Sequence, residues 1–284
     1  MPPPQPAIGV VGHVEWVQFA RVAHVPSPGE VVHAREPLEE PAGGGAVAAV
    51  QAARLAGRST FVTALGEDEH GRRSLARLRE LGVELRPAWR AAPTRRAVTL
   101  VDDSRERTIV TIGERLEPLG SDAGAAWDTL TGLDALYFTA GDVDALRAAR
   151  RASRVLVASP RARHALGHGV ELDALVLSAG DADERREAAR AGSEAELVVL
   201  TDGARGGSWR SRSGDSGSWG PVEPPGAPVD SYGCGDSFAA GLTYGLGAGL
   251  GAAESLALAA RCGASCLTGS GPYERQLGWR EMTG

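Results

Sequence analysis

Apolar positions along this chain fall into short runs separated by longer amphipathic segments. Runs of three to six residues at 7–12, 60–65, 135–138, 155–157, 175–177 and 197–201 predict buried β-strands. Helices are predicted between these runs, at 43–55, 70–81, 144–151 and 182–191, from apolar residues at helical spacing or from stretches of small residues. Two further helices are predicted from Asp236 and over 252–268. Alternating strands and helices predict an α/β fold with a doubly wound, mostly parallel sheet flanked by helices.

Two strand-rich segments interrupt this alternation, at about 14–38 and 94–112. The first shows strand-like stretches, including 31–34, that are broken by Pro26, Pro28 and Gly29. In the second, 96–101 and 107–112 flank a polar turn and predict a hairpin. Both segments are expected to form a small sheet beside the main one. The Ser/Gly-rich stretch 211–220 predicts a solvated hairpin or loop.

Length and charge narrow the class of protein. A chain of 284 residues suits one large α/β domain, or one domain with a small appendage. A net charge of −6 argues against a nucleic-acid partner or an acidic membrane surface. No apolar segment is long enough to span a bilayer, and the N-terminus lacks the features of a signal peptide. Three cysteines do not form a disulfide framework, so a cytoplasmic location is expected.

All 30 cationic side chains are arginine, and the chain contains neither lysine nor asparagine. A P-loop lysine and a Schiff-base lysine are therefore excluded. Any phosphate must be held by backbone N–H groups, arginine, Ser/Thr hydroxyls or a metal ion.

The most informative motif is Asp230-Ser-Tyr-Gly-Cys-Gly-Asp236, which runs directly into a predicted helix. A glycine-rich turn at the positive end of a helix aims backbone N–H groups at one point and suits a phosphate. We expect Gly233, Cys234 and Gly235 to form this anion hole. A carboxylate there would repel a resting phosphate, so Asp236 is predicted to be a general base that deprotonates an attacking hydroxyl.

This stretch resembles the C-terminal signature of the ribokinase-like (PfkB-type) carbohydrate kinases, Asp-Thr-x-Gly-Ala-Gly-Asp-x-Phe. Ser231 and Cys234 replace its Thr and Ala. A second stretch, from Gly43 through the spacing Gly66-x-Asp68-x-x-Gly71, resembles the N-terminal signature of the family. The resemblance extends over nearly the whole chain. It implies a single ribokinase-like kinase domain over 1–284, in which the two strand-rich insertions form a β-sheet lid over the substrate.

The resemblance also implies ATP and Mg²⁺ as cofactors. Thr201-x-Gly203-x-x-Gly206 resembles the turn that holds nucleotide phosphates, although an ordinary turn between strands is the better interpretation of this motif taken alone. The family lines its adenine pocket where this chain has Gly263 and Ser265, and simple helix packing remains an alternative there.

Metal and substrate roles follow from the resemblance in the same way. Asp181 stands at the end of a segment that matches the magnesium-organising Asn-x-x-Glu, and it equally suits a helix N-cap. Asp230 matches a position near a monovalent cation, K⁺, in members that need one. Gly43 and Gly44 match the turn that substrate hydroxyls approach. With His13 and Glu15, and with Asp236 itself, they are the predicted substrate contacts.

The chain departs from ribokinases at the positions that hold the sugar diol. Glu15 and Val17 stand where the family has Asn and Asp, and Val47 replaces another Asn. A site built to bond a diol discriminates strongly, so these changes argue against ribose. Strand alternation places His13 and Glu15 on one face and Trp16 on the other, so all three cannot contact the substrate.

The sequence therefore predicts an ATP-dependent kinase that phosphorylates a hydroxyl, a primary alcohol by preference, of a small sugar, polyol or nucleoside. One alternative is a nucleotide-binding or regulatory protein that has lost turnover on the same fold. Another is a nicotinamide-dependent oxidoreductase, suggested by Gly43-x-Gly45-x-x-Ala48 but weakened because residues 36–42 do not read as a buried strand. Open edges of the lid strands predict a possible homodimer.

Overall fold

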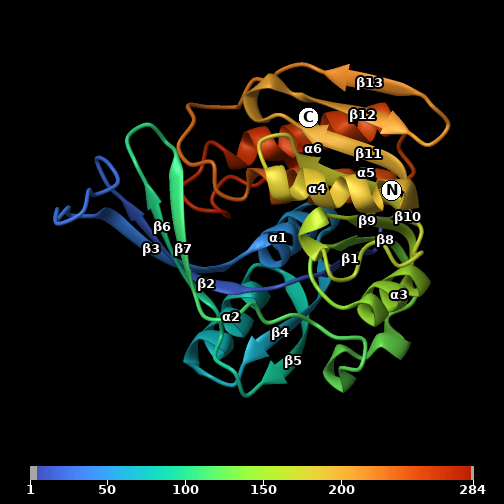
Figure 1. The fold of residues 1–284 in the computed structure, drawn as a ribbon, viewed down its shortest axis with the longest axis horizontal. Helices are drawn as coiled ribbons and strands as arrows, with labels where there is room; N and C mark the ends of the chain where they lie inside the picture. Colours follow the sequence, from blue (N-terminus) through green and yellow to red (C-terminus); the bar gives the residue numbers. More distant parts are fainter. Residues whose placement is uncertain (1–4, 283–284) are drawn as a thin grey trace.

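A computed structural model describes residues 5–282 and shows a nine-stranded sheet covered by helices on both faces (Figure 1). The strand order is β13-β12-β11-β10-β9-β8-β1-β4-β5. All neighbours pair in parallel except the β11–β12 and β12–β13 pairs, which are antiparallel. The mostly parallel sheet predicted from the sequence is confirmed. Its strands are β1 (Ile8–Val11), β4 (Ser59–Gly66), β5 (Val83–Arg90), β8 (Leu133–Phe138), β9 (Ser153–Ala158), β10 (Leu172–Ser178), β11 (Ala195–Thr201), β12 (Gly207–Ser211) and β13 (Ser216–Trp219).

The helices divide between the two faces because each turns its apolar side toward the strands. Helices α1 (Gly44–Ala56), α2 (Glu69–Glu80), α5 (Cys234–Gly247) and α6 (Ala252–Cys266) contribute to one hydrophobic cluster. Helices α3 (Val143–Ala152) and α4 (Ala182–Ala191) contribute to the cluster on the opposite face. A short helix, α7 (Trp279–Met282), follows near the end of the chain. No helix within residues 5–282 is long and apolar enough to cross a membrane.

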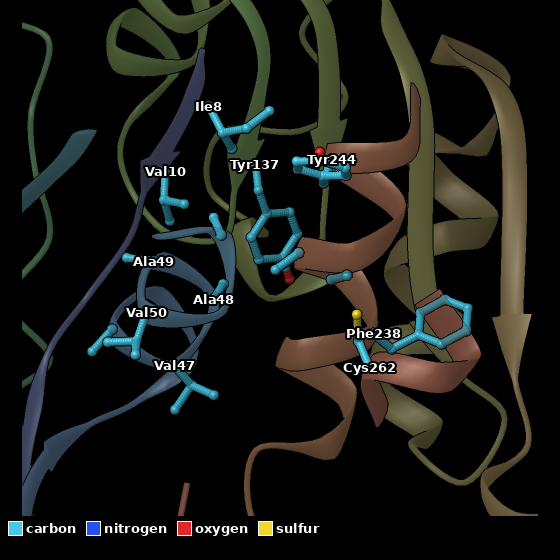
Figure 2. Packing of buried hydrophobic residues seen from close by; sticks show 14 of the residues in the cluster. Ile8, Val10, Val47, Ala48, Ala49, Val50, Tyr137, Phe238, Tyr244 and Cys262 are labelled. Carbon is cyan, nitrogen blue, oxygen red and sulfur yellow. The ribbon is translucent and has the colours of Figure 1, made fainter. Parts of the chain in front are cut away.

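The main core joins α1 and α5 to the middle of the sheet. Tyr137, from β8, lies between these two helices (Figure 2). Val10 on β1 and Val47 on α1 are almost completely buried in the same cluster. Each such side chain stabilises the fold by roughly 1.5–3 kcal/mol relative to an exposed position. This packing fixes the starts of α1 and α5 relative to each other.

A second, four-stranded sheet projects from the main body (Figure 1). Its order is β3-β2-β6-β7, from β2 (Glu15–Arg21), β3 (Arg35–Ala42), β6 (Arg96–Val101) and β7 (Arg107–Ile112). The β6–β7 hairpin is antiparallel, as predicted, and β2 pairs in parallel with β6. We call this sheet the lid.

The sequence prediction of a strand at 31–34 is wrong. These residues are irregular, and Val31 is 81% exposed, so they offer no apolar face to a sheet. The strand that pairs with β2 is β3, which ends at Ala42, four residues beyond the predicted insertion. Residues 36–42 are thus part of a strand, but an antiparallel strand of the lid. A dinucleotide fingerprint needs a strand of the parallel sheet before its glycines, so the oxidoreductase reading loses its structural basis.

Candidate active site

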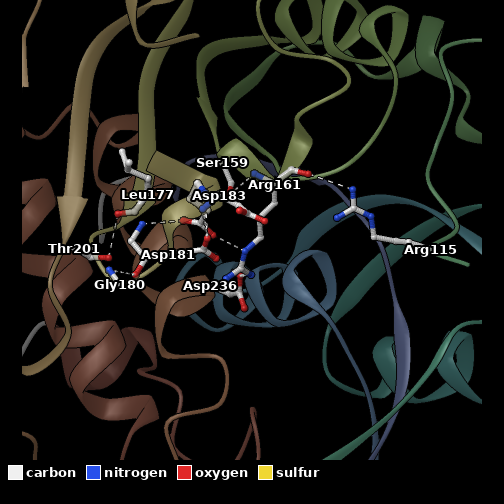
Figure 3. Close-up of polar contacts among 11 residues, drawn as sticks. Arg115, Ser159, Arg161, Leu177, Gly180, Asp181, Asp183, Thr201 and Asp236 are labelled. Carbon is white, nitrogen blue, oxygen red and sulfur yellow. Dashed lines mark hydrogen bonds and ion pairs between the residues drawn. The ribbon is translucent and has the colours of Figure 1, made fainter. Parts of the chain in front are cut away.

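The predicted site residues gather at the carboxyl ends of the parallel strands, where open α/β sheets place their ligands. Thr139 follows β8, and Arg161 lies in a 3-10 turn, Pro160–Ala162, after β9. Thr201 closes β11, and the first turn of α5 faces the same edge. Figure 3 shows Arg161, Asp181, Thr201 and Asp236 together in this region.

The glycine-rich loop enters α5 as the sequence predicts, but the helix begins at Cys234 rather than Asp236. Gly233 is its N-cap and has φ +82°, a left-handed conformation that side chains disfavour. A β-carbon at Gly233 would also lie 2.9 Å from Cγ1 of Val47. First-turn N–H groups of a helix have no partner within the helix, and Cys234 N makes only a 3.5 Å contact, to Ser231 O. The N–H groups in the first turn of α5 therefore have no acceptor within the helix.

Asp236 is in direct contact with an arginine that the sequence analysis did not single out. Nη1 of Arg161 lies 3.3 Å from Oδ1 of Asp236, and Nε of Arg161 lies 2.8 Å from Oε1 of Glu184. The other oxygen of Glu184 accepts a 2.8 Å hydrogen bond from the backbone N–H of Ser178. The charge of Asp236 raises the pKa of Arg161, burial opposes this, and Glu184 adds to the increase. The guanidinium of Arg161 therefore stays protonated beside both carboxylates.

The sequence held one signal for this contact, a cation immediately after a buried strand and a Ser-Pro pair at 159–160. It did not show which carboxylates would face Arg161. Glu184 is separated from Asp236 by 52 positions, and only the packing of α4 beside β10 brings it near.

The Gly43–Gly44 turn lies against Asp236, so the two motifs predicted to hold the substrate do meet. A β-carbon at Gly44 would lie 3.0 Å from Oδ1 of Asp236 and 3.4 Å from Oγ1 of Thr139. The N–H of Gly43 donates a 3.3 Å hydrogen bond to the hydroxyl of buried Tyr232. That bond ties the glycine-rich loop before α5 to the turn before α1.

His13 and Glu15 lie on the same side, as strand alternation predicts. Nε2 of His13 is 3.4 Å from Oε1 of Glu15, and Nη1 of Arg95 is 3.3 Å from the same oxygen. Burial opposes ionisation of Glu15, but the His13 hydrogen bond and the nearby arginines lower its pKa. Trp16 lies elsewhere, under the guanidinium of Arg73.

Val17 and Val47 are both completely buried in the main core. Neither side chain is exposed, so neither lines an open cavity.

Three of the predicted nucleotide residues lie at or just after the end of β11, and the other two, Gly263 and Ser265, lie on α6. The hydroxyl of Thr201 donates to the carbonyl of Leu177 at 3.2 Å. Gly203 and Gly206 both have positive φ, which suits a tight turn after the strand. Gly263 faces the Cys234 carbonyl, since a β-carbon there would lie 3.2 Å from it, and Ser265 donates to the Arg275 carbonyl at 2.7 Å.

The two carboxylates predicted to hold cations have structural contacts. Oδ1 of Asp181 caps α4 by accepting from the N–H groups of Asp183 and Glu184 at 2.9 and 3.1 Å. Both oxygens of buried Asp230 accept backbone N–H groups, from Tyr232 at 2.8 Å and Gly271 at 3.1 Å. Within residues 5–282 no group of three His, Cys, Asp or Glu side chains forms a metal cage. Mg²⁺ bound with nucleotide phosphates needs only one or two protein carboxylates, so this donor set still fits it.

Comparison with known proteins gives a consistent picture. The model of the pfkB family of carbohydrate kinases matches residues 6–277. No curated protein sequence matches the chain. Among solved structures, the ribokinase from Giardia lamblia has a TM-score of 0.82 at 19% identity, covering 98% of both chains. Arabidopsis thaliana ribokinase complexed with ribose and ATP has a TM-score of 0.77 at 17% identity, again covering 98% of both. The Methanocaldococcus jannaschii nucleoside kinase has a TM-score of 0.73 at 15% identity, covering 98% of this chain and 97% of that one.

Proposed function

We propose, since this chain belongs to the pfkB family of carbohydrate kinases, that it transfers the terminal phosphoryl group of ATP to a hydroxyl of a small sugar, polyol or nucleoside. The observation that carries the proposal is the approach of Asp236 Oδ1 to the Gly43–Gly44 turn, beside the first turn of α5. A base, a hydroxyl-binding turn and an anion hole then share one small volume. The similar Arabidopsis ribokinase, complexed with ribose and ATP, supports ATP as the donor.

In this mechanism the acceptor hydroxyl lies over Gly44 and gives its proton to Asp236 as its oxygen bonds to the terminal phosphorus. The bond between that phosphorus and the bridging oxygen breaks, and ADP leaves. The N–H groups of Gly233, Cys234 and Gly235 stabilise charge on the transferring group. Such preorganised donors act without reorganising at the moment of reaction.

The nucleotide would lie along the end of β11, with phosphates against Thr201, Gly203 and Gly206 and the adenine against α6 near Gly263 and Ser265. When bound with the nucleotide, Mg²⁺ neutralises phosphate charge. We retain Asp181 as a candidate for holding it through water, because the second carboxylate oxygen, Oδ2, makes no hydrogen bond to a described residue. A K⁺ site beside Asp230 stays a prediction.

The acceptor is a polar molecule other than ribose. Three buried polar atoms near the turn and Glu15 lack hydrogen-bond partners among the described residues: His13 Nδ1, Arg95 Nε and Thr139 Oγ1. A buried donor or acceptor without a partner costs about 1–3 kcal/mol, so a hydroxylated substrate would relieve this cost. Val17 and Val47 stand at positions where ribokinases have side chains that bind the sugar diol, and this argues against ribose as the acceptor.

The test is ADP release from Mg-ATP against a panel of sugars, polyols and nucleosides, with Asp236→Asn as the control. We expect release with one class of acceptor and a loss of about 10²–10⁴-fold in kcat in the variant, because a positioned base contributes that much. The circular dichroism of the variant should stay that of a folded protein. Turnover retained without the carboxylate would refute Asp236 as the base.

A binding or regulatory protein on the same fold is the second candidate. The ion pair between Arg161 and Asp236 favours it, because Arg161 occupies the oxygen, Oδ1, that would accept the proton of an acceptor hydroxyl. Tight ATP binding without acceptor-dependent ADP release, in the same panel, would support this candidate over the kinase.

A homodimer through the lid also stays a proposal. The edge strand β7 is exposed along its whole length and includes Ile109, Val110 and Ile112. Sedimentation equilibrium of the full chain tests it, and a monomer at high concentration would exclude it. The cytoplasmic location remains a prediction from the sequence.

A further inference from the structure

We infer that Arg161 is a catalytic residue of the proposed phosphoryl transfer: it holds Asp236 toward the acceptor hydroxyl and neutralises charge on the transferring group. The inference rests on the proposed kinase function. No motif of the sequence assigned a role to this side chain.

Arg161 contacts two carboxylates and keeps one nitrogen without a protein partner among the described residues. Its Nε and Nη1 are used by Glu184 and Asp236, while Nη2 makes no hydrogen bond to a residue in 5–282. The carboxylates of Glu184 and Asp236 are only 7% and 14% exposed, whereas the side chain of Arg161 is 41% exposed. The guanidinium is therefore anchored through Nε and Nη1, and part of it remains exposed to solvent.

The guanidinium of Arg161 also lies close to the atoms that react in the proposed mechanism. A β-carbon at Gly44 would lie 3.0 Å from Asp236 Oδ1, 3.4 Å from Thr139 Oγ1 and 3.6 Å from Arg161 Nη1. Because glycine has no side chain, these three polar atoms converge on an open face of Gly44, and an acceptor hydroxyl that approaches this face would meet them. The oxygen that attacks phosphorus and the guanidinium are therefore neighbours in the proposed complex.

The charge balance of the reaction also bears on the role of Arg161. As the acceptor oxygen bonds to phosphorus, its proton passes to Asp236 and the electron pair of the broken P–O bond leaves with ADP. Negative charge lies on the phosphoryl oxygens throughout, next to the carboxylate of Asp236. The carboxylate and the phosphoryl oxygens repel each other, and a fixed cation beside both lowers the electrostatic energy of this repulsion. Arg161 is fixed in this position by Glu184, which itself is bonded to the start of the β10–α4 connection.

The guanidinium also orients the base. With Oδ1 of Asp236 held at 3.3 Å by Arg161, the carboxylate cannot rotate freely away from Gly44. The transition state of phosphoryl transfer is loose, so catalysis depends mostly on positioning. A carboxylate that is correctly oriented can therefore serve as the base.

The test uses a readout that needs no acceptor. We would measure the affinity of the full chain for Mg-ADP alone and for Mg-ADP with aluminium fluoride, a mimic of the transferring phosphoryl. Arg161→Ala should bind Mg-ADP nearly as the wild type does, but lose about 100-fold of the extra affinity that aluminium fluoride gives. Arg161→Lys should keep part of it, and added guanidinium ion should restore part of it to Arg161→Ala. The matched control is Arg163→Gln, an exposed arginine two positions away with no side-chain contact in the described part of the chain.

The outcomes separate this inference from the proposed function. Wild-type protein that gains no affinity with aluminium fluoride, or binds no Mg-ADP, overturns the kinase and the role of Arg161 together. A wild-type gain that Arg161→Ala keeps overturns the role of Arg161 and leaves the kinase intact. Where an acceptor has been found, the kcat of Arg161→Ala should fall about 10²–10³-fold with a smaller change in KM. An increase in acceptor KM alone would make Arg161 a substrate-binding residue and refute the catalytic role.

Discussion

Replacing Gly44 by alanine should separate activity from stability. The added β-carbon would lie 3.0 Å from Oδ1 of Asp236, closer than such contacts normally are, so the carboxylate must move by a few tenths of an ångström. The methyl group would also cover the face of Gly44 that the acceptor hydroxyl is proposed to approach, beside Asp236 and Thr139. The acceptor would then be displaced by about 1 Å, which costs roughly 10²-fold in rate. In free energy this is about 2.7 kcal/mol of transition-state stabilisation.

The stability of the Gly44→Ala variant should change much less than its activity. Gly44 is the first residue of α1 and does not have positive φ, so alanine is compatible with its backbone. Alanine in a helix is favoured over glycine by roughly 0.5–1 kcal/mol, which offsets part of the close contact. We therefore expect the stability of Gly44→Ala to stay within about 1 kcal/mol of the wild type, a shift of roughly 2–4 °C in Tm for a domain of this size.

The assay pairs kcat/KM from ADP release with thermal unfolding followed by circular dichroism. Gly251→Ala is the matched control, because it precedes α6, away from the site, and a β-carbon there meets only Glu254 Oε2, at 4.0 Å. Its kcat/KM should equal that of the wild type. A folded Gly44→Ala variant with unchanged kcat/KM would refute the placement of the acceptor over Gly44, and with it the shared volume on which the mechanism depends.

Two further substitutions test the surroundings of the site. Tyr232→Phe removes the acceptor of the buried Gly43 N–H, so the free energy of unfolding should fall by about 1–3 kcal/mol in a denaturant titration; an unchanged midpoint would contradict the bond. Glu15→Gln tests the lowered pKa of Glu15, whose carboxylate is hydrogen-bonded to His13 and lies beside Arg95. Ionised Glu15 stabilises the folded state fully above the ordinary pKa of about 4.5. This contribution is lost as the pH falls through the lower pKa of the folded state. Unfolding measured from neutral to acid pH should show a wild-type advantage at neutral pH that disappears in acid, and a pH-independent difference would contradict this.

Much of the fold could be predicted from the sequence because its signals are local. Six of the parallel strands carry a short apolar run, namely β1, β4, β8, β9, β10 and β11. The polar turn at 102–106 fixes the β6–β7 hairpin. Prediction failed where the signal depended on partners. The apolar pair at 31–32 looked like a strand, but β2 pairs instead with the charged and proline-containing β3. Strand β5 also escaped prediction, because Glu84, Arg86 and Pro87 interrupt its apolar positions at the sheet edge.

The sequence by itself determined the chemistry available in the site. The spacing from Gly233 to Asp236 requires a glycine turn, helix N–H groups and a carboxylate within a single turn of chain, whatever the rest of the fold does. Tertiary structure alone decided what Asp236 faces. Gly44, Arg161 and Glu184 come from three separate crossovers of the sheet, and they meet only because parallel strands bring their carboxyl ends to one edge. Contacts between side chains so distant along the chain depend on the packing of whole elements, and no local pattern of residues records them.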